Sequence, residues 1–251
     1  MSNPQIRIGI GGWDYDPWRG TFFPKGLAKA KQLSFAAEHL TAIEINATYY
    51  RSQKPETFAN WAKAVPDGFR FAVKASRFAT NRKVLADGAE SIDRFLGQGI
   101  TELGDRLGPI LWQFMATKKF DAAEFAAFLK LLPEKQDGIR LRHALEVRHE
   151  SFRDPDFFAL VKKANAAIVF ADSDDFPKID EPTADFTYAR LQRCAEDCPT
   201  GYDEKSLDRW AEQAKAWNQR GDVFVFFISG AKVRAPAAAL ALQHRLGIAR
   251  G

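Results

Sequence analysis

Cysteine is scarce in this sequence. Only Cys194 and Cys198 occur among its 251 residues, too few for the disulfide framework of a small secreted protein. No other cysteine or histidine lies close to them in the sequence, so a structural zinc site is not indicated. We interpret the two as unreactive loop thiols or, in second place, as a reversible redox pair, and both interpretations fit a reducing compartment.

Long apolar runs and a secretion signal are also missing. No stretch approaches the roughly 18 apolar residues that cross a bilayer. Residues 1–5 lack the basic and apolar regions that a signal peptide needs. We therefore expect a cytoplasmic protein with no membrane partner.

The chain has little excess charge of either sign. It carries 36 Lys and Arg against 32 Asp and Glu, a formal net charge of +4. The longest basic runs are pairs, such as Lys118 with Lys119 and Lys162 with Lys163, far short of the stripe typical of nucleic-acid binding. Nucleic acid is therefore not the expected partner. Glycine-rich fingerprints for dinucleotides and nucleoside triphosphates are absent too, so no nucleotide cofactor is predicted.

The sequence does contain a regular succession of short apolar runs. They recur at intervals near thirty residues, with amphipathic patterns typical of helices between most of them. The expected strands are residues 6–11, 42–47, 69–75, 109–114, 141–149, 167–172, 186–192 and 223–229. The expected helices are residues 27–40, 55–65, 89–107, 121–132, 155–166, 204–220 and 235–246.

Eight strands alternating with helices predict an α/β fold, a TIM-barrel-like (β/α)8 barrel that forms a single domain over residues 1–251. One crossover is irregular, because residues 173–185 between the sixth and seventh strands have the composition of a loop. An open doubly wound sheet is less favoured, since no dinucleotide-type turn follows the first strand.

Side chains alternate along a strand, which predicts the residues that face the barrel interior. In the fifth strand Leu145 and Val147 form the apolar outer face, so Glu146 and Arg148 point inward. Asp172 ends the sixth strand and joins the group with a less defined direction. The other polar residues predicted to face inward are Glu44, Asn46, Lys74, Gln113 and Arg190.

The charged residues of this group balance, with three of each sign. A buried ion costs several kcal/mol unless it is paired, hydrated or bound to a ligand. All of them lie late in their strands, where barrels of this type hold their active sites. The pattern predicts an active site at the C-terminal mouth or, alternatively, a salt-bridge network that only plugs the barrel.

Aromatic residues are expected around the same mouth. Trp13 and Tyr15 follow the first strand, and Tyr49 follows the second. They are candidates for a ligand-binding wall or for a cap on the barrel. His149 follows the inward Arg148 and is a candidate for proton transfer or for packing at the strand end.

Five segments carry a resemblance to a known family: residues 12–24, 44–51, 69–74, 111–114 and 146–151. In this order they resemble the domain-of-unknown-function 72, or YecE-like, family over nearly the whole chain. The resemblance implies a TIM-barrel-like fold and no established function. It also implies shared polar residues at Glu44, Asn46, Lys74, Gln113, Glu146, Arg148, His149, Asp172 and Arg190. The sequence departs from the family pattern at Gln192 and Arg193, in place of His-Gly, and at Ile228 and Ser229, in place of Asn-Asn.

Two familiar barrel chemistries fit these residues poorly. A glycosidase would place carboxylates on the fourth and seventh strands, where Gln113 and Arg190 stand. A metal-dependent enzyme needs about four converging ligands, and only Glu44, Glu146 and Asp172, with His149 as a fourth, are available. The inward cations oppose a metal unless an anionic substrate lies beside it. We therefore assign no metal ligands and keep a divalent metal as a second hypothesis.

The favoured hypothesis is an enzyme that acts by acid–base chemistry on a small phosphorylated or carboxylated metabolite. Arg148 and Arg190 would hold the anion, while Glu44 and Glu146 would exchange protons with the substrate. Lys74 is expected to stay charged and to stabilise negative charge in preference to Schiff-base chemistry.

The remaining substrate-binding candidates are Asn46, Gln113, Asp172, Trp13, Tyr15 and Tyr49. Hydrolysis, isomerisation and lyase chemistry all fit this set. The alternatives are a metal-dependent phosphoester or nucleic-acid hydrolase and a noncatalytic ligand-binding protein. The sequence does not indicate an oligomeric state.

Overall fold

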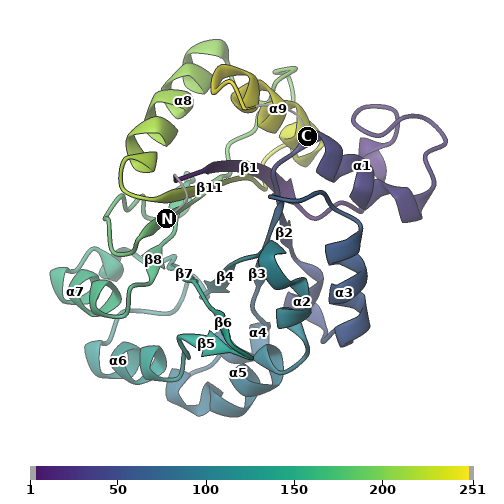
Figure 1. Ribbon diagram of the computed structural model, residues 1–251. Helices are drawn as coiled ribbons and strands as arrows, with labels where there is room; N and C mark the ends of the chain where they lie inside the picture. Colours follow the sequence, from purple (N-terminus) through teal and green to yellow (C-terminus); the bar gives the residue numbers. More distant parts are fainter. Residues whose placement is uncertain (1–3, 249–251) are drawn as a thin grey trace.

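The apolar runs form one parallel sheet in the computed structural model, which describes residues 4–248. Its strands are β1 (Ile6–Gly11), β2 (Ala42–Ile45), β3 (Arg70–Lys74), β4 (Leu107–Gln113), β7 (His143–Glu146), β8 (Ala167–Ile168), β9 (Phe170–Asp172), β10 (Phe186–Leu191) and β11 (Asp222–Phe227). They pair in the order β8-β7-β4-β3-β2-β1-β11-β10-β9. Seen end-on, the strands surround a common axis and the helices lie outside them (Figure 1). The predicted TIM-barrel-like fold is confirmed.

The barrel is nearly closed through the strand predicted at residues 167–172. This strand is interrupted at Val169, so its halves are β8 and β9. β8 pairs with β7, and β9 pairs with β10 on the other side. The backbone N–H of Val169 donates to the carbonyl oxygen of Leu145 at 3.0 Å. The two edges of the sheet are thus one residue apart in the chain.

Helices surround the sheet, most of them on its outer face, with α2 at the C-terminal mouth. They are α1 (Gln32–His39), α2 (Ala47–Tyr50), α3 (Pro55–Lys63), α4 (Arg77–Thr80), α5 (Ala89–Leu96), α6 (Ala122–Lys130), α7 (Pro155–Lys163), α8 (Glu204–Asn218) and α9 (Ala235–Arg245). Short 3₁₀ helices span Asp16–Trp18, Lys29–Lys31, Leu85–Gly88, Ile100–Arg106, Glu150–Phe152 and Lys232–Arg234. A small hairpin of β5 (Lys135–Gln136) and β6 (Ile139–Arg140) precedes β7.

Local sequence explains where the longer helices begin. Proline occupies the first turn of α3, α7 and α9, where its missing N–H costs nothing. The side chain of Asp121 caps α6, and that of Asp154 caps α7. Residues 173–185, all of which the structure describes, contain no helix, so the irregular crossover is confirmed. Among the helices of residues 4–248, none combines the length and apolarity needed to cross a bilayer.

Three predicted elements differ most in extent. The helix expected at residues 27–40 begins only at Gln32, after the 3₁₀ helix at Lys29–Lys31. The helix expected at residues 89–107 ends at Leu96 and is followed by a 3₁₀ helix, because Gly99 turns the chain at a φ of 102°. A Cβ at Gly99 would lie 2.7 Å from the Cα of Pro55, so glycine is required for close contact with α3. The strand expected at residues 141–149 is shorter, because its last pairing joins Glu146 to Gln113 at the end of β4.

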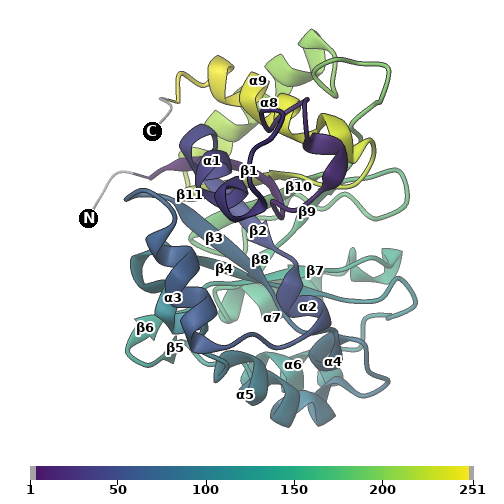
Figure 2. The ribbon, with the colours of Figure 1, turned by 90° about the vertical axis from the view of Figure 1, so that its right-hand side faces the viewer.

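The barrel interior is built in three layers. The middle layer is apolar, with alanines on β2, β3, β7 and β8 facing aromatic rings on β10 and β11; its members include Ala42, Ala72, Ala144, Ala167, Phe186, Tyr188, Phe224 and Phe226. A charged layer lies on the N-terminal side of the middle layer. It consists of Arg70, Arg142 and Asp222, which precede Ala72, Ala144 and Phe224 by two residues. Two residues after the middle layer stand polar side chains at the C-terminal mouth, the end of the barrel that carries α2 (Figure 2). The predicted outward residues, among them Ile43, Phe71 and Leu145, pack against the helices.

Candidate active site

Five strands each bring one polar residue to the C-terminal mouth: Glu44, Lys74, Gln113, Glu146 and Arg190. Each follows the middle apolar layer by two residues, so the alternation that buries the alanines also aims these side chains inward. Glu44 and Glu146 are fully buried, and Arg190 is 3% exposed. The predicted convergence of these five residues is therefore observed.

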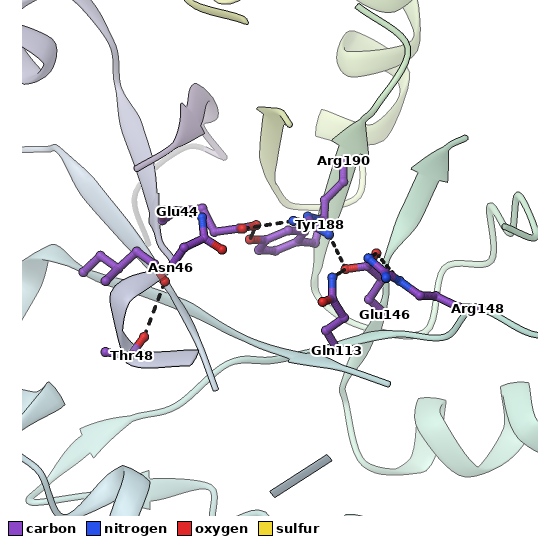
Figure 3. Close-up of polar contacts among 9 residues, drawn as sticks. Glu44, Asn46, Thr48, Gln113, Glu146, Arg148, Tyr188 and Arg190 are labelled. Carbon is purple, nitrogen blue, oxygen red and sulfur yellow. Dashed lines mark hydrogen bonds and ion pairs between the residues drawn. The ribbon is translucent and has the colours of Figure 1, made fainter. Parts of the chain in front are cut away.

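Arg190 joins the two buried carboxylates (Figure 3). Its Nη1 lies 2.5 Å from Oε2 of Glu146, and its Nη2 lies 3.2 Å from Oε1 of Glu44. The hydroxyl of Tyr188 donates to the other oxygen of Glu44 at 2.7 Å. The two carboxylates outweigh the effect of burial and raise the pKa of Arg190 above its ordinary value, so its charge is permanent.

Glu146 receives further donors. Nε2 of Gln113 donates to Oε2 at 2.7 Å, while Nη2 and Nε of Arg148 donate to Oε1 at 2.8 and 3.1 Å. Burial alone would raise the pKa of Glu146, but the two guanidinium groups and these hydrogen bonds lower it to about 2. Glu146 is therefore an ionised acceptor at neutral pH.

Lys74 differs from its neighbours because none of these carboxylates pairs with it. No carboxylate of residues 4–248 forms an ion pair with its Nζ within 4.0 Å. The Nζ instead lies 4.2 Å from the centre of the Tyr49 ring. Burial, together with the charge of Arg190, lowers the pKa of Lys74 to about 8. Carboxylates were expected to surround Lys74 and keep it charged; none pairs with it and its pKa is lowered, although the charged form still predominates at pH 7.

A cavity of about 560 Å³ opens above this cluster. Its charged and polar lining consists of Asp14, Asn46, Lys74, Gln113, Arg148, Arg190, Ser229 and Lys232. Trp13, Trp18 and Tyr50 supply aromatic walls. Glu44 and Glu146 are not part of the lining, because Arg190 and its neighbours cover them. The volume is typical of a site for a small molecule.

Two predicted site residues lie elsewhere. Asp172 points to the outside of the barrel wall, into a second cavity of about 450 Å³, where it accepts a hydrogen bond from Tyr202 at 3.3 Å and lies 3.6 Å from Lys178. His149 lies at the start of a 3₁₀ helix, where its Nδ1 accepts from the backbone N–H of Ser151 at 3.1 Å. Neither side chain lines the mouth cavity.

Of the three aromatic residues predicted at the mouth, Trp13 lines the cavity, while Tyr15 and Tyr49 pack against residues that line it. Trp13 lines the cavity and packs edge-on against Trp61 with ring centres 5.2 Å apart. Tyr15 packs behind Trp18 and beneath Lys232, whose Nζ lies 4.4 Å from its ring centre. Tyr49 contacts Lys74 as described above.

Tyr188 and Lys232 are among the site residues that were not predicted from the sequence. Tyr188 shares the inward direction of Arg190, so the alternation could have identified it. Lys232 follows β11 and reaches the cavity only because its carbonyl oxygen accepts a hydrogen bond from Nε1 of Trp18 at 2.9 Å. No local pattern predicts that contact, since the two residues are far apart in the chain.

The cysteines have the character expected of loop thiols. Both are free, and Cys194 is buried. Burial raises the pKa of the Cys194 thiol to about 12, so little reactive thiolate forms near neutral pH.

The site does not fit a divalent metal ion. Within residues 4–248 no group of three or more His, Cys, Asp or Glu side chains is placed to hold one. The carboxylate oxygens of Glu44 and Glu146 are engaged by Arg190, Arg148, Tyr188 and Gln113. Asp172 faces the other cavity.

Comparison with known proteins gives a family match over almost the entire chain. The family described as "Protein of unknown function DUF72" matches residues 7–251. The UPF0759 protein YecE of Escherichia coli (strain K12) is 29% identical over 157 residues, which cover 61% of this chain and 50% of that protein. The match thus spans about half the length of this curated relative.

Solved structures share the fold. A DUF72 family protein from Thermotoga maritima MSB8 has a TM-score of 0.78 at 22% identity, covering 97% of this chain and 99% of that chain. A D-psicose 3-epimerase, crystallised in the presence of D-fructose, has a TM-score of 0.57 at 14% identity, covering 96% and 99%. The TM-scores show a common barrel fold, and at these identities they show nothing about a shared activity.

Proposed function

The chain belongs to the DUF72 family, whose function is unknown, and from the geometry of its own cavity we propose that it is an enzyme acting on a small anionic metabolite. The substrate would be phosphorylated or carboxylated and would bind at the C-terminal mouth of the barrel. Acid–base chemistry would be carried out by groups that line the cavity.

The charge of the cavity supports this proposal most directly. Four cationic residues line it: Lys74, Arg148, Arg190 and Lys232. The lining contains one carboxylate, Asp14, and that carboxylate pairs with Lys29 at 2.6 Å. A cavity with this lining favours an anion over a neutral or cationic ligand.

The donors of Arg190 and Arg148 suit an oxyanion. Nε of Arg190 is buried without a hydrogen-bond partner among the described residues. A buried donor without an acceptor is costly, and a ligand oxygen would relieve that cost. Arg148 is partly exposed and stacks on Phe176, with its guanidinium carbon 4.3 Å from the ring centre. Arginine in such a setting binds phosphate or carboxylate with defined geometry.

The two buried glutamates take a different part from the one expected from the sequence. Because Arg190 separates them from the cavity, they do not contact a ligand there. We assign Glu44 and Glu146 as positioning residues that hold Arg190 and Arg148. Lys74 is the group in the cavity whose pKa, about 8, lies close to neutral pH, as a general acid or base requires.

Two alternatives remain distinct from this proposal. A metal-dependent phosphoester hydrolase lacks a fitting ligand set at the mouth. A noncatalytic ligand-binding protein would use the same cationic cavity, so only a turnover measurement separates it from an enzyme. Ile228 and Ser229, where the chain departs from the family pattern, both line the cavity and would tune which anion binds.

The test is a thermal-shift screen with inorganic phosphate and with phosphorylated and carboxylated metabolites. A ligand that binds only the native state raises its stability by about 3 kcal/mol at a hundred times its Kd. We expect such shifts for the wild type and a loss of most of the shift in Arg148→Ala. Each variant is compared with and without ligand, so a change in its intrinsic stability cancels.

The matched control is Arg153→Ala. Arg153 lies five residues further along the chain, half-exposed and paired with Glu150, and it does not line the cavity. Its ligand shift should equal that of the wild type. Equal shifts in Arg148→Ala, or stabilisation by divalent metals alone, would refute the proposed anion site. A ligand that binds but is not converted would favour the binding protein.

A further inference from the structure

We infer that Lys74 is a nucleophile that forms an imine with a carbonyl group of the bound substrate. This inference rests on the proposed function and narrows its substrate class to anionic aldehydes or ketones, such as oxoacids or phosphorylated carbonyl compounds. It also assigns Lys74 to covalent catalysis, in addition to electrostatic stabilisation.

The position of Lys74 is that of a group aimed at a ligand. It ends β3 at the same level as the Arg190 cluster, is 7% exposed and lines the mouth cavity. Its backbone is fixed by Thr48, whose hydroxyl donates to the Lys74 carbonyl oxygen at 2.7 Å. The side chain therefore starts from a rigid strand end and points into open volume.

The surroundings of Lys74 raise the fraction of its amine that is neutral, although Glu44 and Glu146 oppose this shift. Glu44 and Glu146, the carboxylates on neighbouring strands, are bound to Arg190 and its partners. Lys74 is left desolvated beside the cation Arg190, and these two conditions are the ones that activate lysine nucleophiles. With a pKa of about 8, about one tenth of Lys74 is neutral at pH 7.

The other lysine of the cavity is less suited. Lys232 lies over two rings, those of Tyr15 and Trp18 at 4.4 and 5.4 Å, whereas Lys74 lies over one, that of Tyr49 at 4.2 Å, so the rings favour the charged form of Lys232 more strongly. The carboxylate of Asp14 opposes the effect of burial on the pKa of Lys232. Lys232 is therefore better placed to attract the anionic group of the substrate than to attack a carbonyl.

The proposed step balances without an oxidant or a cofactor. The neutral Nζ of Lys74 adds to the carbonyl carbon, and the carbon–oxygen π bond opens to give a carbinolamine. The oxygen then leaves as water with the two protons of the amine, and a carbon–nitrogen double bond remains. Protonation of that nitrogen creates an electron sink next to the anionic group, which the cations of the cavity hold in place.

The experiment traps the imine by reduction. Pyruvate and glycolaldehyde phosphate serve as probes, with sodium cyanoborohydride as the reductant, and peptide mass spectrometry locates the reduced adduct. We expect a saturable adduct at Lys74 in the wild type, at least tenfold above that at any exposed lysine. Lys74→Arg keeps the charge and should abolish it, whereas Lys162→Arg, at an exposed site on α7, should leave it unchanged.

Two further arms separate this inference from the proposed function. Lactate and glycerol phosphate carry the same anionic groups without a carbonyl, and their thermal shifts report anion binding alone. If they stabilise the protein while Lys74 remains unmodified by either probe, the imine is refuted and the anion site stands. If label spreads over exposed lysines in the same proportion in Lys74→Arg, the inference is also refuted. If neither the shifts nor the adduct appear, both proposals fail.

Discussion

At the residue scale, the chemistry of the barrel mouth depends on which cation pairs with the two buried glutamates. Arg190 forms ion pairs with both of them, so neither pairs with Lys74. Arginine suits the first role because its planar guanidinium bridges two carboxylates at once and keeps its charge when buried. Lysine suits the second because its pKa responds to burial. The chemistry of the site follows from which of the two cations each carboxylate contacts.

Replacing Glu146 by glutamine should destabilise the fold strongly. The change leaves the buried Arg190 and the half-buried Arg148 without their charged acceptor, and breaking such a pair costs about 3–5 kcal/mol. The measurement is urea unfolding at neutral pH. Glu90→Gln is the control, because its exposed pair with Arg94 should contribute less than about 1 kcal/mol. Equal losses in the two variants would contradict this assignment.

The same residue predicts acid sensitivity. The pKa of Glu146 falls from an ordinary 4.5 to about 2 on folding, so its stabilisation is complete above about pH 4.5. It is lost as the pH falls towards 2, and over this range the wild type should lose roughly 3 kcal/mol more than Glu146→Gln. Urea midpoints measured across this window test the difference, and parallel curves would count against it.

Lys74→Met should have the opposite effect on stability. The folded-state pKa of Lys74 is about 8 against an ordinary 10.5, so its charged form destabilises the fold below about pH 8. Methionine fills the space without a charge and should raise the free energy of unfolding by about 1–3 kcal/mol at neutral pH. The gain should shrink as the pH rises from 8 to 10.5. A loss of stability at neutral pH would show that the ammonium group is well solvated after all.

Strand alternation predicted most of the residues at the mouth, and it failed for identifiable reasons. It placed Glu44, Lys74 and Arg190 together because inward positions repeat every second residue. It did not predict their partners, since these contacts cross between β2, β7 and β10 and depend on side-chain reach. Asp172 was misplaced because Val169 faces inward, so a residue three positions later faces the opposite side.

At the element scale, the sequence pattern predicts where helices and strands lie, whereas contacts with neighbouring elements determine where they end. Apolar periodicity located the strands, and proline or aspartate marked the starts of α3, α6 and α7. Periodicity could not show that the pattern of residues 89–107 covers two elements, because the break at Gly99 is imposed by contact with Pro55. Lengths of strands likewise depend on where a neighbour stops, as at Gln113 and Glu146.

The pairing of β1 with β2 should be intolerant of a side chain at Gly9. A Cβ there would lie 2.0 Å from the carbonyl oxygen of Ala42, its partner in the ladder. Gly9→Ala should therefore cost about 3 kcal/mol or more in urea unfolding, because the clash is between backbones and no rotamer relieves it. Gly68→Ala is the control: it has a φ of 82° and open space, so backbone strain alone should cost about 1 kcal/mol. Similar losses in both would argue against the close approach.

At the scale of the whole molecule, the sheet has its shortest pairing at the seam formed by β8 and β9. β10 pairs with β11 over six residues and β1 with β11 over five, whereas β8 pairs with β7 over only two and β9 with β10 over three, as many as β1 with β2. No helix follows β9 in residues 173–185, although Trp210 and Trp217 of α8 cover Phe170 of β9. Fewer ladder bonds mean a lower free energy of local opening.

Hydrogen exchange followed by mass spectrometry should therefore find residues 167–172 opening before the rest of the sheet. We expect their amides to exchange about tenfold or more faster than those of β11 under native conditions. Arg190 stands on β10, beside the seam, and also lines the mouth cavity, so an anion that binds it should slow exchange in β9 as well as at the mouth. Arg148→Ala should weaken that protection, and Arg153→Ala should not. Exchange that is uniform around the barrel would mean that the interrupted strand closes the sheet as firmly as the others.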